Sequence, residues 1–499
     1  MKIGDLFDRR ALCQTGLRHK SIHGLQYDSR KLEPDDLFFA FPGEHVDGHQ
    51  FIPAALDAGA AAIVSERKAP APYSGQWIQV PHDRQALASA ALRFYGRPDH
   101  QLKLTGVTGT NGKTSTVHLL DSILENAGLL TARFGTIEHK IGRRRLRAVN
   151  TTPESLDIVR FLADLVAEGG SHASFEASSH ALDLGRVYGF DFHTVVFTNL
   201  SRDHLDYHQT MEQYAAAKRL LLQGAGGETP RYAVINRDDP VGREWLDTSS
   251  SETLSFGVQP GADIVAENVD VRLSSLHFRA ATPRGSLEVR SSLGGVFNIS
   301  NLLAAITAAL TLDIDLDTIG EGIEACRAVP GRFELIDEGQ PFIVIVDYAH
   351  TDDALRNLLE AARELLRCSN RPGRILTVFG CGGDRDRTKR PVMGEIAGRL
   401  SDLVILTSDN PRSENPLNII NDIRVGLGRV ESEHEIEADR AAAIRRAVSQ
   451  GQAGDIVLLA GKGHETTQTI GGEVISFDDR ETVRGVLHEL GYGVHSVAG

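Results

Sequence analysis

The stretch "GVTGTNGKTST", residues 106–116, combines three evenly spaced glycines with a lysine and a threonine. The segment "LKLTGVT" that leads into it predicts a β-strand, and residues 114–127 predict a helix with Gly128 just beyond its end. In a strand-to-helix turn of this kind, backbone N–H groups and the helix N-terminus can face phosphate. Lys113 is then placed to reach terminal phosphates, and the hydroxyl of Thr114 to bind magnesium. The stretch therefore predicts a nucleotide-phosphate loop in an α/β sheet.

The glycine spacing of this loop differs from that of the common P-loop, which has a glycine five positions before its Gly-Lys-Thr. Val107 occupies that position here, and the glycines fall at Gly106, Gly109 and Gly112. A glycine-rich turn with a surface lysine is the simpler alternative. The preceding strand, the spaced glycines and the Lys-Thr pair together favour phosphate binding.

Composition narrows the classes to which the protein can belong. Its 499 residues suggest roughly three domains, and a content of 41% hydrophobic and 24% charged residues is typical of globular proteins. The four cysteines include no Cys-x-x-Cys pair, and the charged N-terminus lacks the apolar run of a signal peptide or membrane span. We therefore expect a cytoplasmic protein without membrane insertion. A net charge of -14 disfavours nucleic acid as a partner.

Turn-rich stretches divide the chain into three segments. Residues 1–98 carry short strand-like runs and alanine-rich helical runs such as "IPAALDAGAAAIVS", and they end in "YGRPDH". Residues 99–329 alternate apolar strand candidates with helical patterns, which predicts a mostly parallel α/β sheet. Residues 330–499 contain four apolar strand candidates that end in polar or glycine-rich residues. Such strand ends are where α/β sheets build binding sites.

Hard oxygen donors follow two strand candidates of the middle segment. Glu176 ends the strand in "SFEASSH", and Asp203 and His204 follow the strand before "SRDHLDYH". Alone, each would more often be structural, but downstream of a phosphate loop they favour magnesium binding. Lys218, in the helix predicted by "MEQYAAAKRLLL", indicates by its own pattern only a solvated surface charge.

A nucleotide-controlled switch without ligation chemistry is the rival from another functional class. In "YAVINRDD", Asn236 and Asp239 have the spacing of the guanine-binding Asn-Lys-x-Asp motif, but Arg237 replaces its lysine. A turn that closes a strand explains the same residues.

Ten motifs occur in the order found in the Mur ligase family, in the branch that adds the third amino acid to the peptidoglycan precursor; they are "TGTNGKTST", "NTTPES", "EASSHAL", "NLSRDHLDYH", "YAAAKRLL", "GRFE", "DYAHT", "GCGGDRDRTKRPVMG", "DNPR" and "AGKGHE". The resemblance spans nearly the whole chain. It implies an N-terminal UDP-substrate-binding domain (1–98), a central ATP-binding domain with a P-loop-like parallel sheet (99–329) and a C-terminal Rossmann-like, amino-acid-binding domain (330–499).

This resemblance also implies a reaction. ATP phosphorylates the D-glutamate γ-carboxylate of UDP-MurNAc-L-Ala-D-Glu, and the amine of meso-diaminopimelate attacks the resulting acyl phosphate. Magnesium and lysine side chains neutralise the phosphate charge. The family further suggests a monomer in the cytoplasm.

Residue by residue, the resemblance implies four groups of site residues. Catalytic residues are Lys113, Glu176, His204 and a carbamylated Lys218, and the expected magnesium ligands are Thr114, Glu176, His204 and Lys218. Expected nucleotide contacts are Thr108, Gly109, Thr110, Asn111, Gly112, Lys113, Thr114, Asn301, Arg332, Asp347 and Lys462. Expected contacts to the UDP-linked substrate are Ser29, His45, Val46, Asp47, Asn150, Thr151, Thr152, Ser178 and Arg186. Expected contacts to the added amino acid are Arg385, Asp409, Asn410, Pro411, Arg412, Gly461 and Glu465.

The "DNPR" motif predicts which amino acid is added. An arginine fork binds a carboxylate through two parallel hydrogen bonds, which suits the distal carboxylate of meso-diaminopimelate and not the ammonium of lysine. In the family this motif marks diaminopimelate-adding enzymes, so we expect Arg412 to set specificity. Folylpolyglutamate synthetase shares the phosphate loop and is the nearest enzymatic rival, but "YDSR" and "DNPR" argue against it.

Two positions depart from the family pattern. Leu184 stands where a glutamine is common, which puts a polar substrate contact there in doubt, and Asp352 stands where proline is usual. The basic stretch "GRRRLR", residues 142–147, predicts an exposed hairpin tip, with attraction of the anionic substrate as the alternative.

Overall fold

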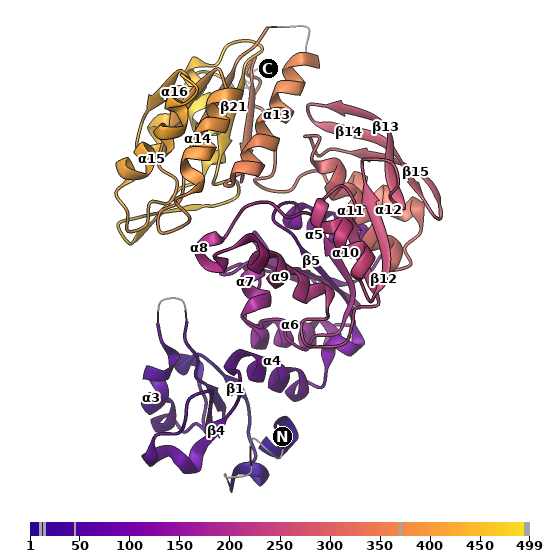
Figure 1. Ribbon diagram of the computed structural model, residues 1–499, viewed down its shortest axis with the longest axis vertical. Helices are drawn as coiled ribbons and strands as arrows, with labels where there is room; N and C mark the ends of the chain where they lie inside the picture. The colour runs from indigo at the N-terminus through magenta and orange to yellow at the C-terminus, as the bar shows by residue number, and fades with distance from the viewer. Residues whose placement is uncertain (9–11, 13–15, 44–45, 369–371, 494–499) are drawn as a thin grey trace, which may run out of the picture.

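The computed structural model describes residues 1–8, 12, 16–43, 46–368 and 372–493. Three sheets follow one another along the longest axis of the molecule, with the N-terminal one at the bottom of Figure 1 and the C-terminal one at the top. Their strands lie at residues 25–79, 103–291 and 334–460, each inside one segment expected from the sequence. The boundaries near residues 98 and 329 stay a prediction.

The N-terminal sheet has four parallel strands in the order β1-β2-β3-β4. They are β1 Leu25–Gln26, β2 Leu37–Phe39, β3 Ala62–Ser65 and β4 Trp77–Gln79. The helices are α1 Ile3–Leu6, α3 Ile52–Asp57 and α4 Asp83–Phe94, with 3-10 turns η1 Gly16–His19, η2 Ser29–Lys31, η3 Gly48–Phe51, η4 Ala71–Gln76 and η5 Pro98–Gln101.

The helical prediction for "IPAALDAGAAAIVS" is wrong in its second half. Helix α3 ends at Asp57, and the last residues of the stretch form the buried strand β3. Gly59, with φ of 92°, turns the chain after the helix, a conformation that glycine adopts without strain. Ile63 and Val64 are β-branched and fit a buried strand better than a helix.

The central sheet has eleven strands in the order β15-β14-β13-β12-β11-β10-β5-β9-β6-β7-β8. They are β5 Lys103–Thr108, β6 Thr131–Phe134, β7 Glu138–Ile141, β8 Arg144–Arg147, β9 His172–Glu176, β10 Phe192–Phe197, β11 Tyr232–Asn236, β12 Glu252–Gly257, β13 Ile264–Arg272, β14 Ser275–Thr282 and β15 Gly285–Ser291. The middle of the sheet, from β13 to β6, is parallel as predicted. Both edges are antiparallel: the β7–β8 edge has the hairpin expected at residues 142–147, whereas the hairpins of β13, β14 and β15 are absent from the prediction.

Helices cover both faces of the central sheet. They are α5 Lys113–Asn126, α6 Ser155–Ala167, α7 Ser179–Asp183, α8 Leu205–His208, α9 Met211–Leu222, α10 Pro240–Thr248, α11 Asn298–Thr311 and α12 Leu316–Ala325. One core, which includes Val117 and Leu302, packs α5, α11 and α12 on one face. The other core is continuous with the N-terminal segment, because it joins Leu87 of α4 to Leu162 of α6.

The C-terminal sheet has the order β16-β17-β21-β18-β19-β20 and is parallel except for β16. Its strands are β16 Glu334–Ile336, β17 Ile343–Asp347, β18 Ile375–Phe379, β19 Leu403–Leu406, β20 His434–Ile436 and β21 Ile456–Ala460, and a separate hairpin contains β22 Thr467–Ile470 and β23 Glu473–Ser476. The helices are α13 Asp352–Cys368, α14 Lys389–Leu400, α15 Pro416–Gly428, α16 Arg440–Gln450 and α17 Asp479–Glu489. The arrangement matches the expected three-domain α/β fold.

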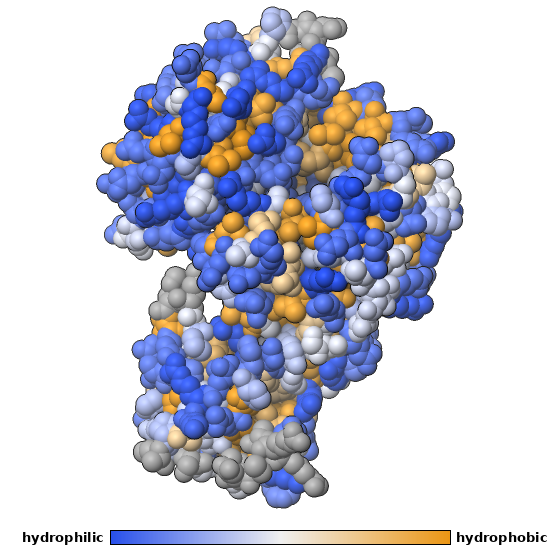
Figure 2. Space-filling model, in the orientation of Figure 1, coloured by the Kyte–Doolittle hydropathy of each residue, from blue (hydrophilic) through white to orange (hydrophobic). Residues whose placement is uncertain are grey.

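Within the part of the chain that the structure describes, no helix has the length and apolar character needed to cross a bilayer. Figure 2 shows a largely hydrophilic face that is hollowed at the left, between the C-terminal segment above and the N-terminal segment below. Helices α7 and α8 lie beside this hollow in Figure 1.

Candidate active site

The predicted phosphate loop connects β5 to α5, with β9 and β10 on either side of β5. Gly109 has φ of 146°, and a Cβ atom there would lie 1.9 Å from Thr198 Oγ1. Gly112 has φ of 87°, and a Cβ atom there would lie 2.2 Å from Asn301 Oδ1. Both positions require glycine for backbone conformation and for space. The unusual glycine spacing thus follows from how closely this loop packs against β10 and α11.

Two lysines converge on the same loop carbonyl. Lys113 Nζ donates to Gly109 O and Thr110 O, both at 2.8 Å, and Lys218 Nζ donates to Gly109 O at 2.7 Å. Lys218 is 1% exposed, so the surface location suggested by its own pattern is wrong. Burial holds the pKa of Lys218 well below its ordinary value, and the charge of Lys113 lowers it further.

Thr114 and Glu176 form an oxygen-rich pair at the start of α5. The hydroxyl of Thr114 donates to Glu176 Oε2 at 2.8 Å, and Glu176 Oε1 accepts from the backbone N–H of Thr136 at 2.8 Å. Among the described residues, no three His, Cys, Asp or Glu side chains cluster as a metal site. Magnesium usually takes one or two protein oxygens and completes its shell with water and phosphate oxygens, so this donor set fits it.

His204 lies on a strained turn after β10, with φ of 54°. Its Nε2 lies 3.3 Å from Asp203 Oδ2, and its ring contacts the rings of His180 and Tyr214. Burial lowers the pKa of His204 to about 3, so its ring is neutral at pH 7. A neutral imidazole can bind a metal through a ring nitrogen.

A cavity of about 530 Å³ joins these groups to the C-terminal segment. Of the predicted residues it is lined by Thr110, Asn111, Gly112, Lys113, Thr114, Thr151, Glu176, Ser178, His204, Lys218, Asn301, Arg332 and Asp347. Most of the expected nucleotide and metal residues therefore share one cavity.

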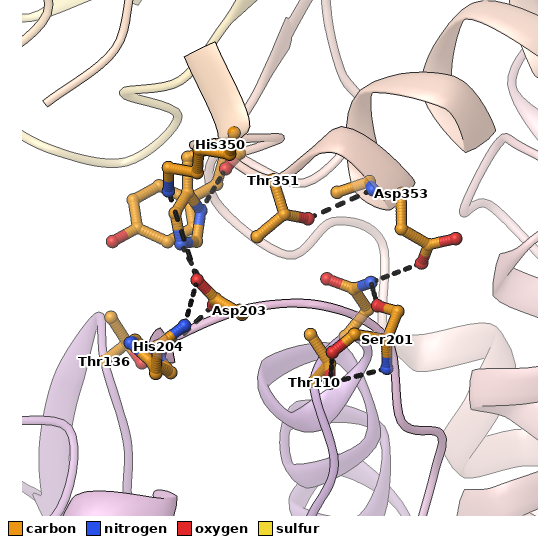
Figure 3. Close-up of polar contacts among 12 residues, drawn as sticks. Thr110, Thr136, Ser201, Asp203, His204, His350, Thr351 and Asp353 are labelled. Carbon is orange, nitrogen blue, oxygen red and sulfur yellow. Dashed lines mark hydrogen bonds and ion pairs between the residues drawn. The ribbon is translucent and has the colours of Figure 1, made fainter. Parts of the chain in front are cut away.

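The C-terminal segment reaches into the phosphate loop through several polar contacts. Figure 3 shows Asp203 between His204 and His350, and the His350 ring nitrogen Nε2 lies 3.9 Å from Asp203 Oδ2. Arg332 Nη2 donates to Thr114 Oγ1 at 3.0 Å, and the loop residue Asn111 donates through Nδ2 to Asp353 Oδ2 at 2.8 Å. The cavity is consequently shared by two segments.

Two other expected nucleotide contacts are used differently. Asp347 accepts the backbone N–H groups of Phe333 and Ala349, so its carboxylate orders the loop after β17. Lys462 Nζ lies 2.8 Å from Glu465 Oε2 and 3.3 Å from Asn410 Oδ1, in the group expected to bind the amino acid. The structure does not bring Lys462 to the cavity lining.

The residues expected to bind the UDP-linked substrate come from the first two segments. Thr152 Oγ1 donates to the backbone carbonyl of Glu176, and Arg186 Nη1 donates to that of Thr152. Ser29 lies in η2, Asn150 and Val46 are exposed, and Asp47 accepts from His49 and Arg67. His45 lies outside the described residues.

The residues expected to bind the added amino acid gather at the carboxyl ends of β18, β19 and β21. Asn410 Nδ2 donates to Glu465 Oε2 at 2.8 Å, and a Cβ atom at Gly461 would lie 2.5 Å from Asp409 Oδ2. Arg412, which follows Pro411, has φ of 51°, and its Nη1 donates to Gly383 O at 2.7 Å. Arg385 and Arg412 both approach Gly382, since a Cβ atom there would lie 3.8 Å from Arg385 Cγ and 3.0 Å from Arg412 Nη1.

Some lining residues escaped the sequence-based prediction. Thr136 contacts both oxygens of Glu176, and Asn199 accepts the Asn111 backbone N–H through Oδ1. Val296 and Phe297 line the cavity just before α11. The only available signals were a Gly-Thr pair after the β6 stretch and an exposed apolar pair before a helix, both of which are common.

The basic stretch at 142–147 forms the turn and outer strand of the β7–β8 hairpin, exposed as expected. Arg144 pairs with Asp164, and Arg145 pairs with Glu138. These acidic partners offset the positive charge that the alternative of substrate attraction needs.

Three family models match the chain. They are the "Mur ligase family, catalytic domain" at residues 21–95, the "Mur ligase middle domain" at 107–309 and the "Mur ligase, glutamate ligase domain" at 331–463. A solved structure of a MurF ligase from Thermotoga maritima in complex with ADP, 21% identical, has the same fold with a TM-score of 0.65 over 94% of this chain and 97% of that one.

Relatives of higher identity cover nearly the whole chain. A protein of Solibacter usitatus named UDP-N-acetylmuramoyl-L-alanyl-D-glutamate--2,6-diaminopimelate ligase is 52% identical over 96% of both chains. One of the same name from Geobacillus thermodenitrificans is 45% identical over 94% of this chain and 95% of its own. A solved structure of a ligase of this name is 35% identical, with a TM-score of 0.67 over 95% of this chain and 96% of that one. On the combined strength of the shared fold, the three matching models and these full-length relatives, the chain belongs to the Mur ligase family.

Proposed function

We propose that the protein is the ATP-dependent ligase that joins meso-diaminopimelate to the D-glutamate γ-carboxylate of UDP-MurNAc-L-Ala-D-Glu. The observation that carries this proposal is that the loop after β19 contains both Asn410, which donates to Glu465, and Arg412, which donates to Gly383 O. An arginine fork suits the distal carboxylate of diaminopimelate, and a glutamate suits its ammonium. The full-length relatives that bear the name of this activity support the same substrate.

The proposed reaction has two steps, phosphoryl transfer and amide formation. An oxygen of the D-glutamate γ-carboxylate attacks the γ-phosphorus of ATP, and ADP leaves with the electrons of the broken P–O bond. The amine of meso-diaminopimelate then attacks the acyl carbon, the C–O bond breaks, and inorganic phosphate leaves as the amide forms and the nitrogen loses a proton. Since no protein nucleophile is needed, positioning and charge neutralisation supply most of the acceleration.

Residues of the cavity can perform this neutralisation. The loop from Gly109 to Thr114 supplies backbone N–H groups at the N-terminus of α5, where the helix dipole favours phosphate. Lys113 Nζ lies against the loop carbonyls of Gly109 and Thr110 and would donate to a terminal phosphate bound there. When bound at Thr114 and Glu176, magnesium would act as a Lewis acid on the phosphoryl oxygens. We propose that Lys218 is carbamylated, and that its carbamate and the ring of His204 join Thr114 and Glu176 as the residues that would hold magnesium.

The contacts between the C-terminal and central segments support an active site that is complete only when these two segments lie against each other. Arg332 and His350 come from the C-terminal segment and touch Thr114 and Asp203 of the central one. Closure of the C-terminal segment would bring the amino-acid site to the acyl phosphate and exclude water, which would otherwise hydrolyse it. We further propose that the protein acts as a monomer in the cytoplasm.

A single assay tests the function. The purified protein is incubated with ATP, magnesium and UDP-MurNAc-L-Ala-D-Glu, and meso-diaminopimelate, L-lysine and L-glutamate are compared in parallel by ADP release and product mass. Of the three amino acids, we expect only meso-diaminopimelate to give rapid turnover. Equal turnover with L-lysine would contradict the assigned amino acid. Use of L-glutamate in a parallel reaction, with a folate in place of the UDP-linked dipeptide, would favour the folylpolyglutamate synthetase alternative.

A further inference from the structure

A buried arginine that the expected site residues do not include lies where the N-terminal and central segments meet. Arg84 is in the first turn of α4, and only 12% of its side chain is exposed. Its guanidinium carbon lies 4.3 Å above the ring of Phe41, which stacks on Tyr27 at 5.9 Å. Both aromatic residues belong to the N-terminal segment. The Arg84 guanidinium is thus fixed by a flat apolar surface, which holds it in place without using its N–H groups.

On its other side Arg84 faces the central segment. Arg84 Nε lies 3.5 Å from Glu154 Oε1, and the same oxygen accepts a 3.0 Å hydrogen bond from Arg186 Nε. Arg186 also donates to the backbone carbonyl of Thr152 at 3.0 Å. Two guanidinium groups therefore share one carboxylate, and this cluster of Arg84, Glu154 and Arg186 carries one excess positive charge.

The hydrogen-bonding capacity of the Arg84 side chain is left unused. Its Nε atom is buried without a hydrogen-bond partner, as is Glu154 Oε2, and the guanidinium makes no hydrogen bond to any other described residue. Nε keeps only its 3.5 Å ion pair with Glu154, and the Nη1 and Nη2 groups, which are not among the buried unpartnered atoms, are available to a ligand. By contrast, Arg93 on the same helix donates to the backbone carbonyl of Leu6. An oxyanion of a ligand would supply what Arg84 lacks.

The surroundings indicate which ligand supplies it. Arg186 and Thr152 are expected contacts of the UDP-linked substrate, and Phe41 begins the loop that leads to Val46 and Asp47. Tyr207 also lies near both arginines: burial and its hydrogen bond to Asp183 raise the pKa of Tyr207 to about 12, and the charges of Arg84 and Arg186 oppose this rise. The UDP-linked dipeptide carries a diphosphate and a D-glutamate α-carboxylate, either of which a guanidinium can bind.

We infer that Arg84 is a further substrate-binding residue, which reaches from the N-terminal segment to bind an oxyanion of the UDP-linked dipeptide together with Arg186. Glu154 is a positioning residue that holds the two guanidinium groups apart and aims them. This inference rests on the proposed function for the identity of the ligand. It means that the substrate bridges the first two segments through a pair of arginines contributed one by each.

The test compares Arg84→Gln, Arg84→Lys and the control Arg93→Gln in the full-length protein. We expect Arg84→Gln to raise both the calorimetric Kd and the KM for UDP-MurNAc-L-Ala-D-Glu about tenfold or more, on the scale of hydrogen bonds to charged groups. The KM values for ATP and meso-diaminopimelate should not change. Arg84→Lys should recover part of the affinity, since a point charge replaces a planar fork. Arg93→Gln should leave the Kd unchanged.

Two further ligands separate the possible oxyanions. Weaker binding of UDP alone by Arg84→Gln places the contact at the diphosphate, whereas loss confined to the dipeptide substrate, with UDP and UDP-MurNAc-L-Ala unaffected, places it at the glutamate carboxylate. An unchanged Kd for all three, or a fall in Tm with a proportionate loss of every kinetic constant, overturns the inference. If the parent protein neither binds nor uses the dipeptide, the proposed function fails instead.

Discussion

Replacement of Arg412 by alanine should remove most of the preference for meso-diaminopimelate. Arg412 Nη1 donates to Gly383 O at 2.7 Å and its backbone N–H to Thr469 O at 3.0 Å, so the guanidinium is held beside the loop that follows β18. A hydrogen bond to a charged group contributes about 1.5 to 3 kcal/mol. Since about 1.4 kcal/mol corresponds to a tenfold change, kcat/KM for meso-diaminopimelate should fall about 10- to 100-fold.

The assay measures kcat/KM for meso-diaminopimelate and L-lysine in the parent, Arg412→Ala and Arg412→Lys. Arg412→Lys should rescue poorly, because an ammonium cannot reproduce the planar fork. Arg387→Ala is a matched control, since Arg387 is 68% exposed and pairs with Glu414 on the same side of the segment. The KM for ATP should stay the same in every variant.

The backbone conformation at Arg412 allows an effect on specificity to be distinguished from an effect on folding. Its φ of 51° is left-handed, so alanine and lysine are strained to a similar degree there and should give similar Tm values. A difference in kcat/KM between these two variants would then report on the side chain. An unchanged ratio of diaminopimelate to lysine in Arg412→Ala would refute the assigned role, even if the ligase activity itself persisted.

Three other outcomes follow from the site. Lys113→Ala should abolish ADP release while the calorimetric Kd for the UDP-linked substrate holds, and normal turnover would reject the phosphate-loop assignment. Lys218→Ala should be nearly inactive, and short-chain carboxylates should partly restore its activity. A ligand-bound crystal structure of the active protein in which Lys218 Nζ carries no added group would contradict carbamylation. Burial raises the pKa of Asp83 to about 7, so the folded state binds more protons than the unfolded one between pH 4 and 7, and its stability contribution falls as pH rises. The Tm of Asp83→Asn relative to the parent should therefore increase from pH 5 to pH 8, and a constant difference would exclude this cause.

Local patterns were sufficient to predict the elements that build the site. The strand, glycine turn and helix around Lys113 were predictable because each depends on residues within one short stretch, and α5 begins one residue earlier than expected. The parallel middle of the central sheet followed from alternating strand and helix patterns. The β7–β8 hairpin was expected from the basic stretch at 142–147, but the hairpins of β13, β14 and β15 were not predicted, since β13 and β15 are largely exposed and give only a weak apolar pattern.

Burial of Lys218 shows where local patterns fail. Its residue type suggests a surface charge, because lysine is rarely buried without a partner. Only the approach of the phosphate loop, more than a hundred residues earlier, places its Nζ atom against Gly109 O and removes it from water. The helical period does place Lys218 on the apolar face with Tyr214 and Leu221, but only the family resemblance supplies a metal-binding role.

Asp352, where proline is usual in the family, is a second residue whose contacts only the fold identifies. Its identity alone suggests a change in the stiffness of a loop, since proline restricts the backbone. In the structure Asp352 begins α13, and its Oδ2 lies 3.0 Å from Arg202 Nη2 of the central segment, beside the contact between Asp353 and Asn111 of the phosphate loop. The substitution therefore adds a charged contact between two segments whose relative position decides whether the nucleotide and amino-acid sites meet. Because Arg202 lies 150 residues away in sequence, only the fold identifies it as the partner.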